Sequence, residues 1–197
     1  MTHPILASSL SVAEPVAAPD QAFGPVVLRP LRSTEAFAAH LKRLDERGRR
    51  LRFGSPVNDG FIDSYVKRQC AGDAEIIGLF VAGTLRGVAE LCLHPSDSTG
   101  AEGAFSLERA FRGRGLGTQL FEALLDAARR LGIASLTLQF LRENVAMQRI
   151  ARRFSAELTF DQSEVTARIA VRPKTPARLS PFAMTWPAQV FSSLQSA

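Results

Sequence analysis

Residues 112–118 read Arg112-Gly113-Arg114-Gly115-Leu116-Gly117-Thr118, and behind them a helical pattern of apolar residues runs without a helix breaker to Leu131. A glycine-rich turn at the start of a helix is typical of phosphate binding, because glycine lets the backbone approach an anion and the first amides of the helix have no partner within it. The two arginines add charge that suits a pyrophosphate. On these residues alone, a solvated loop or an RNA-contacting Arg-Gly run stays open.

The segments on either side of this turn and helix alternate in character as strands do; they are residues 101–107 and 135–141. The Walker phosphate loop ends in Gly-Lys-Ser/Thr, whereas this turn has no lysine. A dinucleotide-binding fold has Gly-x-Gly-x-x-Gly and an acidic residue at the end of the next strand. Here the glycines are spaced by two, and Gln139-Phe140-Leu141 contains no acid. Both nucleotide motifs are therefore disfavoured.

The turn resembles the signature Arg/Gln-x-x-Gly-x-Gly/Ala of the GCN5-related N-acetyltransferase (GNAT) superfamily, which residues 112–117 match position by position. The likeness continues through Arg129-Arg130-Leu131-Gly132 and the next strand to Asn144, and it covers roughly residues 26–171. Leu51-Arg52-Phe53 and residues 101–105 are similar to the acetyltransferase domains of bacterial protein-lysine acetyltransferases. The resemblance implies an α/β (α+β) fold with a mixed, mostly antiparallel twisted sheet of about six to seven strands and about four flanking helices.

Periodicity and turn signals predict the other elements. The helix that begins at residue 116 should bury Leu116, Leu120, Leu124, Ala127 and Leu131. The remaining expected elements are a strand over 26–32, a helix from 33 to Gly48, a short helix over 61–66, strands over 75–81 and 85–94, a loop over 95–100, a helix over 144–154, and a hairpin over 157–160 and 165–171.

The chain length of 197 residues favours one domain with tails. We expect a flexible leader over 1–24, the acetyltransferase-like domain over 25–172, and an apolar tail over 173–197. The tail is expected to dock on the domain or on a partner subunit, which would be compatible with a homodimer. The alternative is that it covers the pocket for the acceptor.

The net charge of +5 suits an anionic ligand without identifying it. Nucleic acid is disfavoured as a partner, because the arginines are not interleaved with aromatic residues. Cys70 and Cys92 lack metal-site spacing and are expected in the core of a reduced, cytoplasmic protein, so no metal is predicted. No apolar run reaches the ~20 residues of a membrane span, and the first residues do not resemble a secretory signal.

Acetyl-CoA is the acyl donor that the resemblance implies. The amides and arginines of residues 112–118 would hold its pyrophosphate, and the pantetheine arm would lie beside Phe105, Ser106 and Leu107, in a gap between two parallel strands. Asn144 would contact the donor near the pantetheine, or would simply cap the helix that it begins.

An amine acceptor must lose a proton to become nucleophilic, so a base is expected near the thioester. Glu102 is the candidate base, because it matches the glutamate that the similar protein acetyltransferases use; the alternative is a salt-bridged or solvent-facing strand residue. Glu90 and His94 are the reserve candidates. The basic cluster of residues 47–52 is expected to be a solvated helix end.

The chain departs from the family at the helix after Asn144. Many relatives have a tyrosine seven residues after the asparagine, which protonates the leaving thiolate, whereas this chain has Ala151. Ser155-Ala156 stands where the family has Gly-Phe. The sequence therefore predicts an N-acetyltransferase that acetylates a primary amine, of a small molecule or a protein lysine, by direct attack. The alternative is an acyl-CoA-binding regulatory module without efficient catalysis.

Overall fold

The computed structural model describes residues 24–72, 74–94 and 97–172. The expected apolar tail over 173–197 and nearly all of the expected leader over 1–24 lie outside the described residues, and so do the side chains of His94, Asp97 and Ser98.

The described residues form one sheet of seven strands in the order β1-β2-β3-β4-β5-β7-β6. All neighbouring strands are antiparallel except β4 and β5, which are parallel. The mixed, mostly antiparallel sheet expected from the sequence is thus confirmed. The strands are β1 (Val26–Pro30), β2 (Glu75–Val81), β3 (Thr84–His94), β4 (Asp97–Leu107), β5 (Ser135–Leu141), β6 (Glu157–Phe160) and β7 (Glu164–Ala170).

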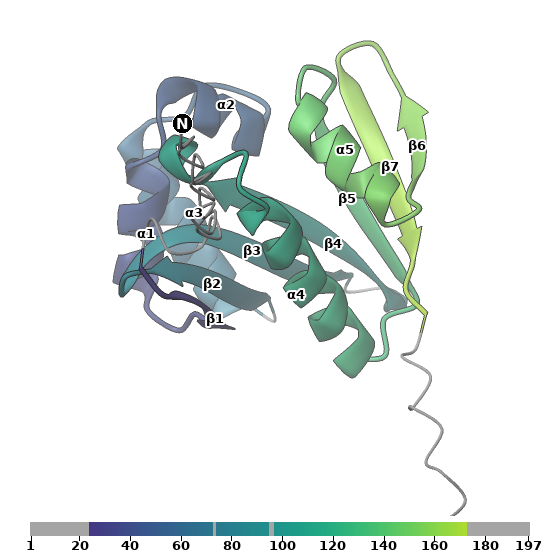
Figure 1. Ribbon diagram of the computed structural model, residues 1–197, viewed down its shortest axis with the longest axis horizontal. Helices are drawn as coiled ribbons and strands as arrows, with labels where there is room; N and C mark the ends of the chain where they lie inside the picture. The colour runs from purple at the N-terminus through teal and green to yellow at the C-terminus, as the bar shows by residue number, and fades with distance from the viewer. Residues whose placement is uncertain (1–23, 73, 95–96, 173–197) are drawn as a thin grey trace, which may run out of the picture.

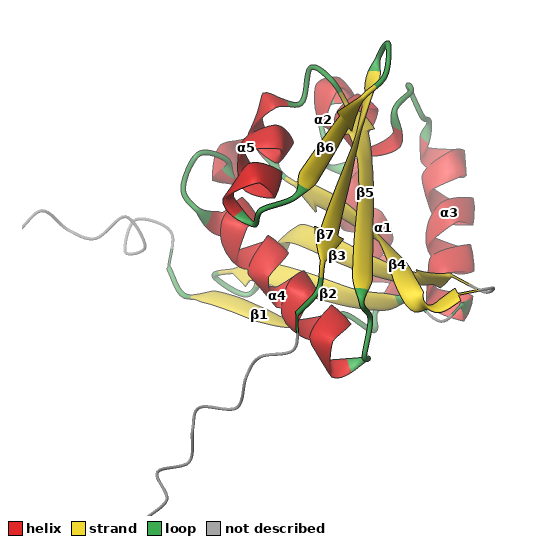
Figure 2. Cartoon of the chain, turned by 90° about the vertical axis from the view of Figure 1, so that its right-hand side faces the viewer, coloured by secondary structure: helices red, strands yellow, loops and turns green. Residues whose placement is uncertain are grey.

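The α-helices in the described part of the chain number five, one more than the expected count of about four. They are α1 (Thr34–Lys42), α2 (Glu46–Phe53), α3 (Asp59–Ala71), α4 (Leu116–Arg130) and α5 (Val145–Arg153), and a 3₁₀ turn, Arg109–Phe111, connects β4 to α4. Figure 2 shows α4 and α5 on one side of the sheet and α1 and α3 on the other.

Strand β2 is buried on both faces and separates two hydrophobic clusters. Ile77 and Leu79 belong to the cluster that contains the apolar side of α4, whereas Ile76 and Phe80 belong to the cluster of α1 and α3. Because side chains alternate between the faces of a strand, a nearly continuous apolar run such as this one has helices on both sides.

The single helix expected from residue 33 to Gly48 is wrong. α1 ends at Lys42, and α2 begins after Asp45, whose side chain accepts a hydrogen bond of 2.7 Å from the Gly48 amide. Gly48 is buried inside α2, where an added Cβ would lie 2.7 Å from Asp45 Oδ1. The glycine therefore allows close packing and does not end a helix.

Three smaller expectations are also wrong. The loop expected over 95–100 already belongs to β4 from Asp97. Leu131 is 45% exposed, because α4 ends at Arg130 and Leu131 follows as its C-cap. Cys70, expected in the core, is exposed on α3, whereas Cys92 is partly buried.

Ser155 is expected to reduce the stability of the domain. It follows α5 with a φ of 57°, a left-handed conformation that disfavours side chains. We expect Ser155→Gly to raise the free energy of unfolding by about 0.5–1 kcal/mol, measured by urea denaturation. Ser163→Gly is the matched control, because Ser163 has no positive φ, and it should have no stabilising effect. Equal effects of the two substitutions would contradict the explanation.

Candidate functional site

The glycine turn before α4 is an open concave backbone surface. Gly113 and Gly115 have φ values of 77° and 80°, and no other heavy atom lies within 4 Å of a Cβ built on either residue. Gly115 is the N-cap of α4 and supplies no side chain to it. Glycine is therefore needed here for its backbone conformation, and it also leaves space in front of the helix.

The first amides of α4 precede the internal hydrogen bonds of the helix. The first hydrogen bonds of α4 are those that Thr118 and Gln119 donate to the Gly115 carbonyl, at 2.9 and 3.1 Å. The amides of Leu116 and Gly117 precede them at the positive end of a 15-residue helix. Gly117 also lets α4 approach α5, because an added Cβ would lie 3.2 Å from Ile150 Cδ1.

The two arginines of the turn occupy different environments. Arg114 is exposed. Arg112 is turned back toward the protein, where its Nε donates a 2.9 Å hydrogen bond to the Leu107 carbonyl. Burial lowers the pKa of its guanidinium. The side chain of Arg112 thus fixes the end of β4 to the start of the turn, a role that the sequence did not indicate.

Strands β4 and β5 separate after a short parallel contact. They pair only at residues 100–102 and 135–137, after which β4 stays paired with β3 and β5 with β7. Figure 1 shows the two strands starting side by side and then diverging, with α2 and α5 near the wide end. The glycine turn before α4 comes after β4 in the chain, so it lies on the β4 side of this opening.

Backbone groups of β4 face the opening at alternate residues. The Thr99 carbonyl accepts from Ala134 on the β5 side, whereas the Glu108 amide donates to Arg86 on the β3 side. Because amides and carbonyls of successive strand residues point to opposite edges, Gly103, Phe105 and Leu107 direct theirs toward the opening and Ser106 directs its own toward β3.

A cavity of about 60 Å³ lies in the opening. Its walls are residues 103–105 of β4 and 138–140 of β5, Leu51 and Arg52 of α2, and Asn144 and Met147 of the α5 region. The Asn144 side chain also accepts a 3.3 Å hydrogen bond from the Met147 amide and so caps α5. Asn144 is therefore both a helix cap and a residue of the cavity wall.

Glu102 is the last residue of β4 that pairs with β5, so it stands where the two strands begin to separate. It is exposed, on the face of the sheet opposite the buried Ala101. It forms no ion pair or hydrogen bond with another described side chain, which excludes the salt-bridged alternative within that part of the chain.

The reserve candidate Glu90 is not available as a base. It is completely buried, its Oε1 accepts from Arg52 Nη2 at 2.5 Å, and its Oε2 accepts from the Tyr65 hydroxyl at 2.5 Å. The side chain of His94, the other reserve, lies outside the described residues. Arg52 was expected among solvated arginines, and its side chain is instead only 9% exposed.

Cys92 lies opposite Glu102 in the β3–β4 ladder. Burial raises the pKa of its thiol to about 11, and the nearby charges of Glu90 and Glu102 act in the same direction. The thiol is therefore protonated at neutral pH and is a poor nucleophile. An acyl-cysteine intermediate at Cys92 is disfavoured.

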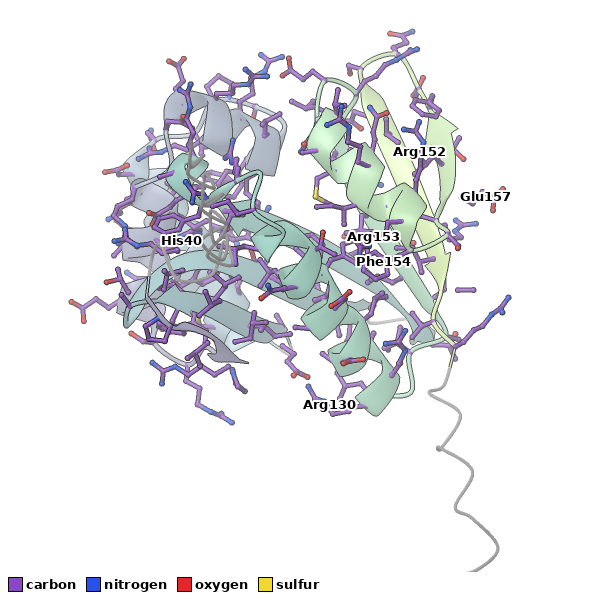
Figure 3. The ribbon with its side chains drawn as sticks, viewed as in Figure 1. His40, Arg130, Arg152, Arg153, Phe154 and Glu157 are labelled. Carbon is purple, nitrogen blue, oxygen red and sulfur yellow. The ribbon has the colours of Figure 1, made fainter. Side chains whose placement is uncertain are left out.

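A group of polar side chains, which the sequence did not reveal, connects α1 to the end of β4. Figure 3 labels one of them, His40. His40 Nε2 lies 2.9 Å from Ser106 Oγ, and His40 Nδ1 lies 3.4 Å from Glu108 Oε1. Glu108 also accepts hydrogen bonds of 2.9 Å from Arg43 and Arg86. His40 lies on the buried side of α1, together with Phe37 and Leu41. Its position beside these apolar residues was the only sequence signal that it would be buried.

Glu108 is expected to make stability depend on pH. Burial alone would raise its pKa, but the hydrogen bonds from His40, Arg43 and Arg86 lower it to about 2. The stabilisation is therefore complete above the ordinary carboxyl pKa and is lost as the pH falls toward about 2. We expect Glu108→Gln to lower the free energy of unfolding at pH 7 by on the order of 2 kcal/mol, and by less at pH 3. Urea denaturation at both pH values tests this, with the exposed Glu157→Gln as control; a loss independent of pH would contradict it.

Residue 151, where many relatives have a tyrosine, lies in the hydrophobic core. Ala151 is completely buried, on the same side of α5 as Asn144 and Met147. Next to it, the rings of Phe105, Phe121 and Phe154 stack with centroid distances of 5.2 and 4.7 Å. The residues that line the cavity include no tyrosine, histidine or cysteine.

Within the described residues, every helix is too short or too polar to span a lipid bilayer. The same residues do not bring together three or more His, Cys, Asp or Glu side chains that could hold a metal ion.

The chain is similar to known proteins in its sequence and in its fold. Residues 44–155 match the model of the Acetyltransferase (GNAT) family. Among solved structures, the GNAT domain of S. lividans PAT has a TM-score of 0.62 at 19% identity, over 73% of this chain and 89% of that chain. For yncA from Salmonella typhimurium, solved with its cofactor acetyl-CoA, the TM-score is 0.60 at 16% identity, over 81% of this chain and 99% of the other. A GNAT-family acetyltransferase from Streptococcus pneumoniae has a TM-score of 0.61 at 14% identity, over 75% of this chain and 100% of that chain. At these identities the solved structures show the fold, and no curated protein sequence matches the chain.

Proposed function

The chain belongs to the GNAT acetyltransferase family, whose members are acetyl-CoA-dependent transferases, and we propose that it transfers the acetyl group of acetyl-CoA to a primary amine. The acceptor is a small-molecule amine or a protein lysine. The observation that carries the proposal is the opening between β4 and β5, which leads from the glycine turn at one end to Glu102 at the other.

The donor fits the residues on this path. The amides of Leu116 and Gly117, together with the space over Gly113 and Gly115, would hold the pyrophosphate at the helix N-terminus. The pantetheine would then extend along β4 and bond to backbone groups of Phe105 and Leu107, in the manner of an added strand. Ser106 would contribute less, because its backbone groups face β3. Asn144 would contact the arm from the wall of the cavity.

Glu102 would act as the general base on the acceptor. A free lysine has a pKa of about 10.4, so presenting its neutral form at pH 7 costs about 4 to 5 kcal/mol. The amine nitrogen attacks the thioester carbon, its proton passes to Glu102 directly or through water, and the carbon–sulfur bond breaks to release CoA thiolate. The thiolate needs no protein acid to leave, because its pKa is close to that of a free thiol. Transfer would be direct, since the Cys92 thiol is protonated.

Ala151 favours a second candidate, an acyl-CoA-binding module with little catalysis. Calorimetric titration with acetyl-CoA, followed by an assay of thiol release with amines and lysine peptides, separates the two. Binding with release of free CoA supports the enzyme, and binding without release supports the module. No binding to the wild-type protein would overturn both.

A further inference from the structure

Arg52 is the charged side chain in the wall of the cavity between β4 and β5. The other wall residues are apolar or neutral, so Arg52 alone among them can donate a charge-assisted hydrogen bond. It lies near the end of α2, on an element that contacts both β4 and β5.

The guanidinium of Arg52 is held in one orientation. Its Nη2 donates to Glu90 Oε1 and to the Tyr65 hydroxyl, both at 2.5 Å. Its Cζ lies 4.8 Å from the centre of the Phe53 ring and 5.2 Å from that of Tyr65. Burial opposes the charge, but Glu90 and Tyr65 outweigh it and raise the pKa, so Arg52 remains protonated. The group is thus placed before any ligand arrives, which is the condition for effective electrostatic stabilisation.

Arg52 has donors in excess of those that the protein uses. Glu90 and Tyr65 accept from Nη2 only, so Nη1 has no acceptor among the described residues. The Nε also lacks an acceptor there, but it is fully buried and closed to a ligand, whereas Nη1 does not belong to the fully buried, unpaired atoms. An oxygen atom of a ligand in the cavity would accept from Nη1.

We propose that Arg52 is a catalytic residue that donates a hydrogen bond to the carbonyl oxygen of the acyl thioester. This inference rests on the proposed function, which places the thioester where β4 and β5 separate. As the amine nitrogen bonds to the carbonyl carbon, the carbonyl electron pair moves onto the oxygen, and Arg52 stabilises that negative charge. The charge then returns as the carbon–sulfur bond breaks, while the amine proton goes to Glu102.

The test compares two donors that differ at the carbonyl. Ethyl-CoA, a thioether, lacks the oxygen that Arg52 would contact, so wild-type protein should bind acetyl-CoA about 10–100-fold more tightly than ethyl-CoA, as one hydrogen bond to a charged group implies. Arg52→Lys keeps a positive charge beside Glu90 but has no planar fork. It should lose this preference and lower kcat about 100-fold, with the affinity for CoA unchanged.

Two further variants complete the design. Arg50→Lys is the matched control, because Arg50 lies on the same helix and pairs with the exposed Glu143. Arg52→Met combined with Glu90→Gln removes the charge pair together, so that no charge is left buried without a partner, and it should behave as Arg52→Lys does. An unchanged preference in both Arg52 variants, with kcat within about threefold of wild type, would overturn the inference. A wild-type protein that binds neither donor would instead refute the proposed function on which it rests.

Discussion

Replacing Gly115 with glutamate is expected to lower the affinity for acetyl-CoA at least about 100-fold, a loss of about 2.7 kcal/mol or more. The new carboxylate would enter the space in front of the α4 N-terminus, where the pyrophosphate is proposed to bind, and would repel it. The backbone at this position has a φ of 80°, so any side chain also strains the turn. Calorimetric titration with acetyl-CoA measures the loss.

The control for this experiment is Gly132→Glu. Gly132 has a φ of 72° and equally open surroundings, but it lies at the opposite end of α4. The two substitutions add the same charge and comparable backbone strain, so only their positions differ. A similar loss of affinity in both variants would assign the effect to strain, and unchanged affinity in Gly115→Glu would refute the proposed phosphate site.

Glu102→Gln is expected to lower kcat about 10²–10⁴-fold at pH 7 with a lysine-like acceptor, while the affinity for acetyl-CoA stays the same. Glutamine cannot take the proton of the amine, so only the small neutral fraction of the acceptor would react. The rate of the variant should therefore rise about tenfold per pH unit until the pH reaches the pKa of the amine. Thiol release across a pH series tests both expectations.

Glu157→Gln is the control for this prediction, since Glu157 is exposed on β6, an edge strand away from the opening (Figure 3). Its kcat should equal that of the wild type. An active Glu102→Gln with an unchanged pH profile would show that Glu102 is not the base and is only a solvent-facing strand residue.

Local patterns allowed much of the fold to be predicted from the sequence. The glycine turn, the helix behind it and the alternating strands were each recognised from neighbouring residues, and the structure confirms these elements and the mostly antiparallel sheet. The break between α1 and α2 was missed, because the apolar spacing of Phe37, Leu41 and Leu44 continues through it. The capping of α2 by Asp45 decides that break.

The residues of the candidate site also fall into those that the sequence revealed and those that it did not. The residues of the turn, Glu102 and Asn144 stood out because each has a recognisable neighbour pattern or a family counterpart. Arg52 was noted only within the family-like stretch Leu51-Arg52-Phe53 and the basic cluster. Its place in the site was hidden, because its partners Tyr65 and Glu90 come from α3 and β3. The pairing of His40 with Ser106 and Glu108 was hidden for the same reason.

By itself, the sequence determined the family, the elements around the glycine turn and the donor that they imply, because these depend on residues that lie close together in the chain. Only the tertiary structure decided where β4 and β5 separate, that Glu90 is buried in an ion pair, and that Arg52 reaches the cavity. Those features depend on the packing of α2 and α3 against strands far away in the sequence, and such packing leaves no periodic pattern in the chain itself.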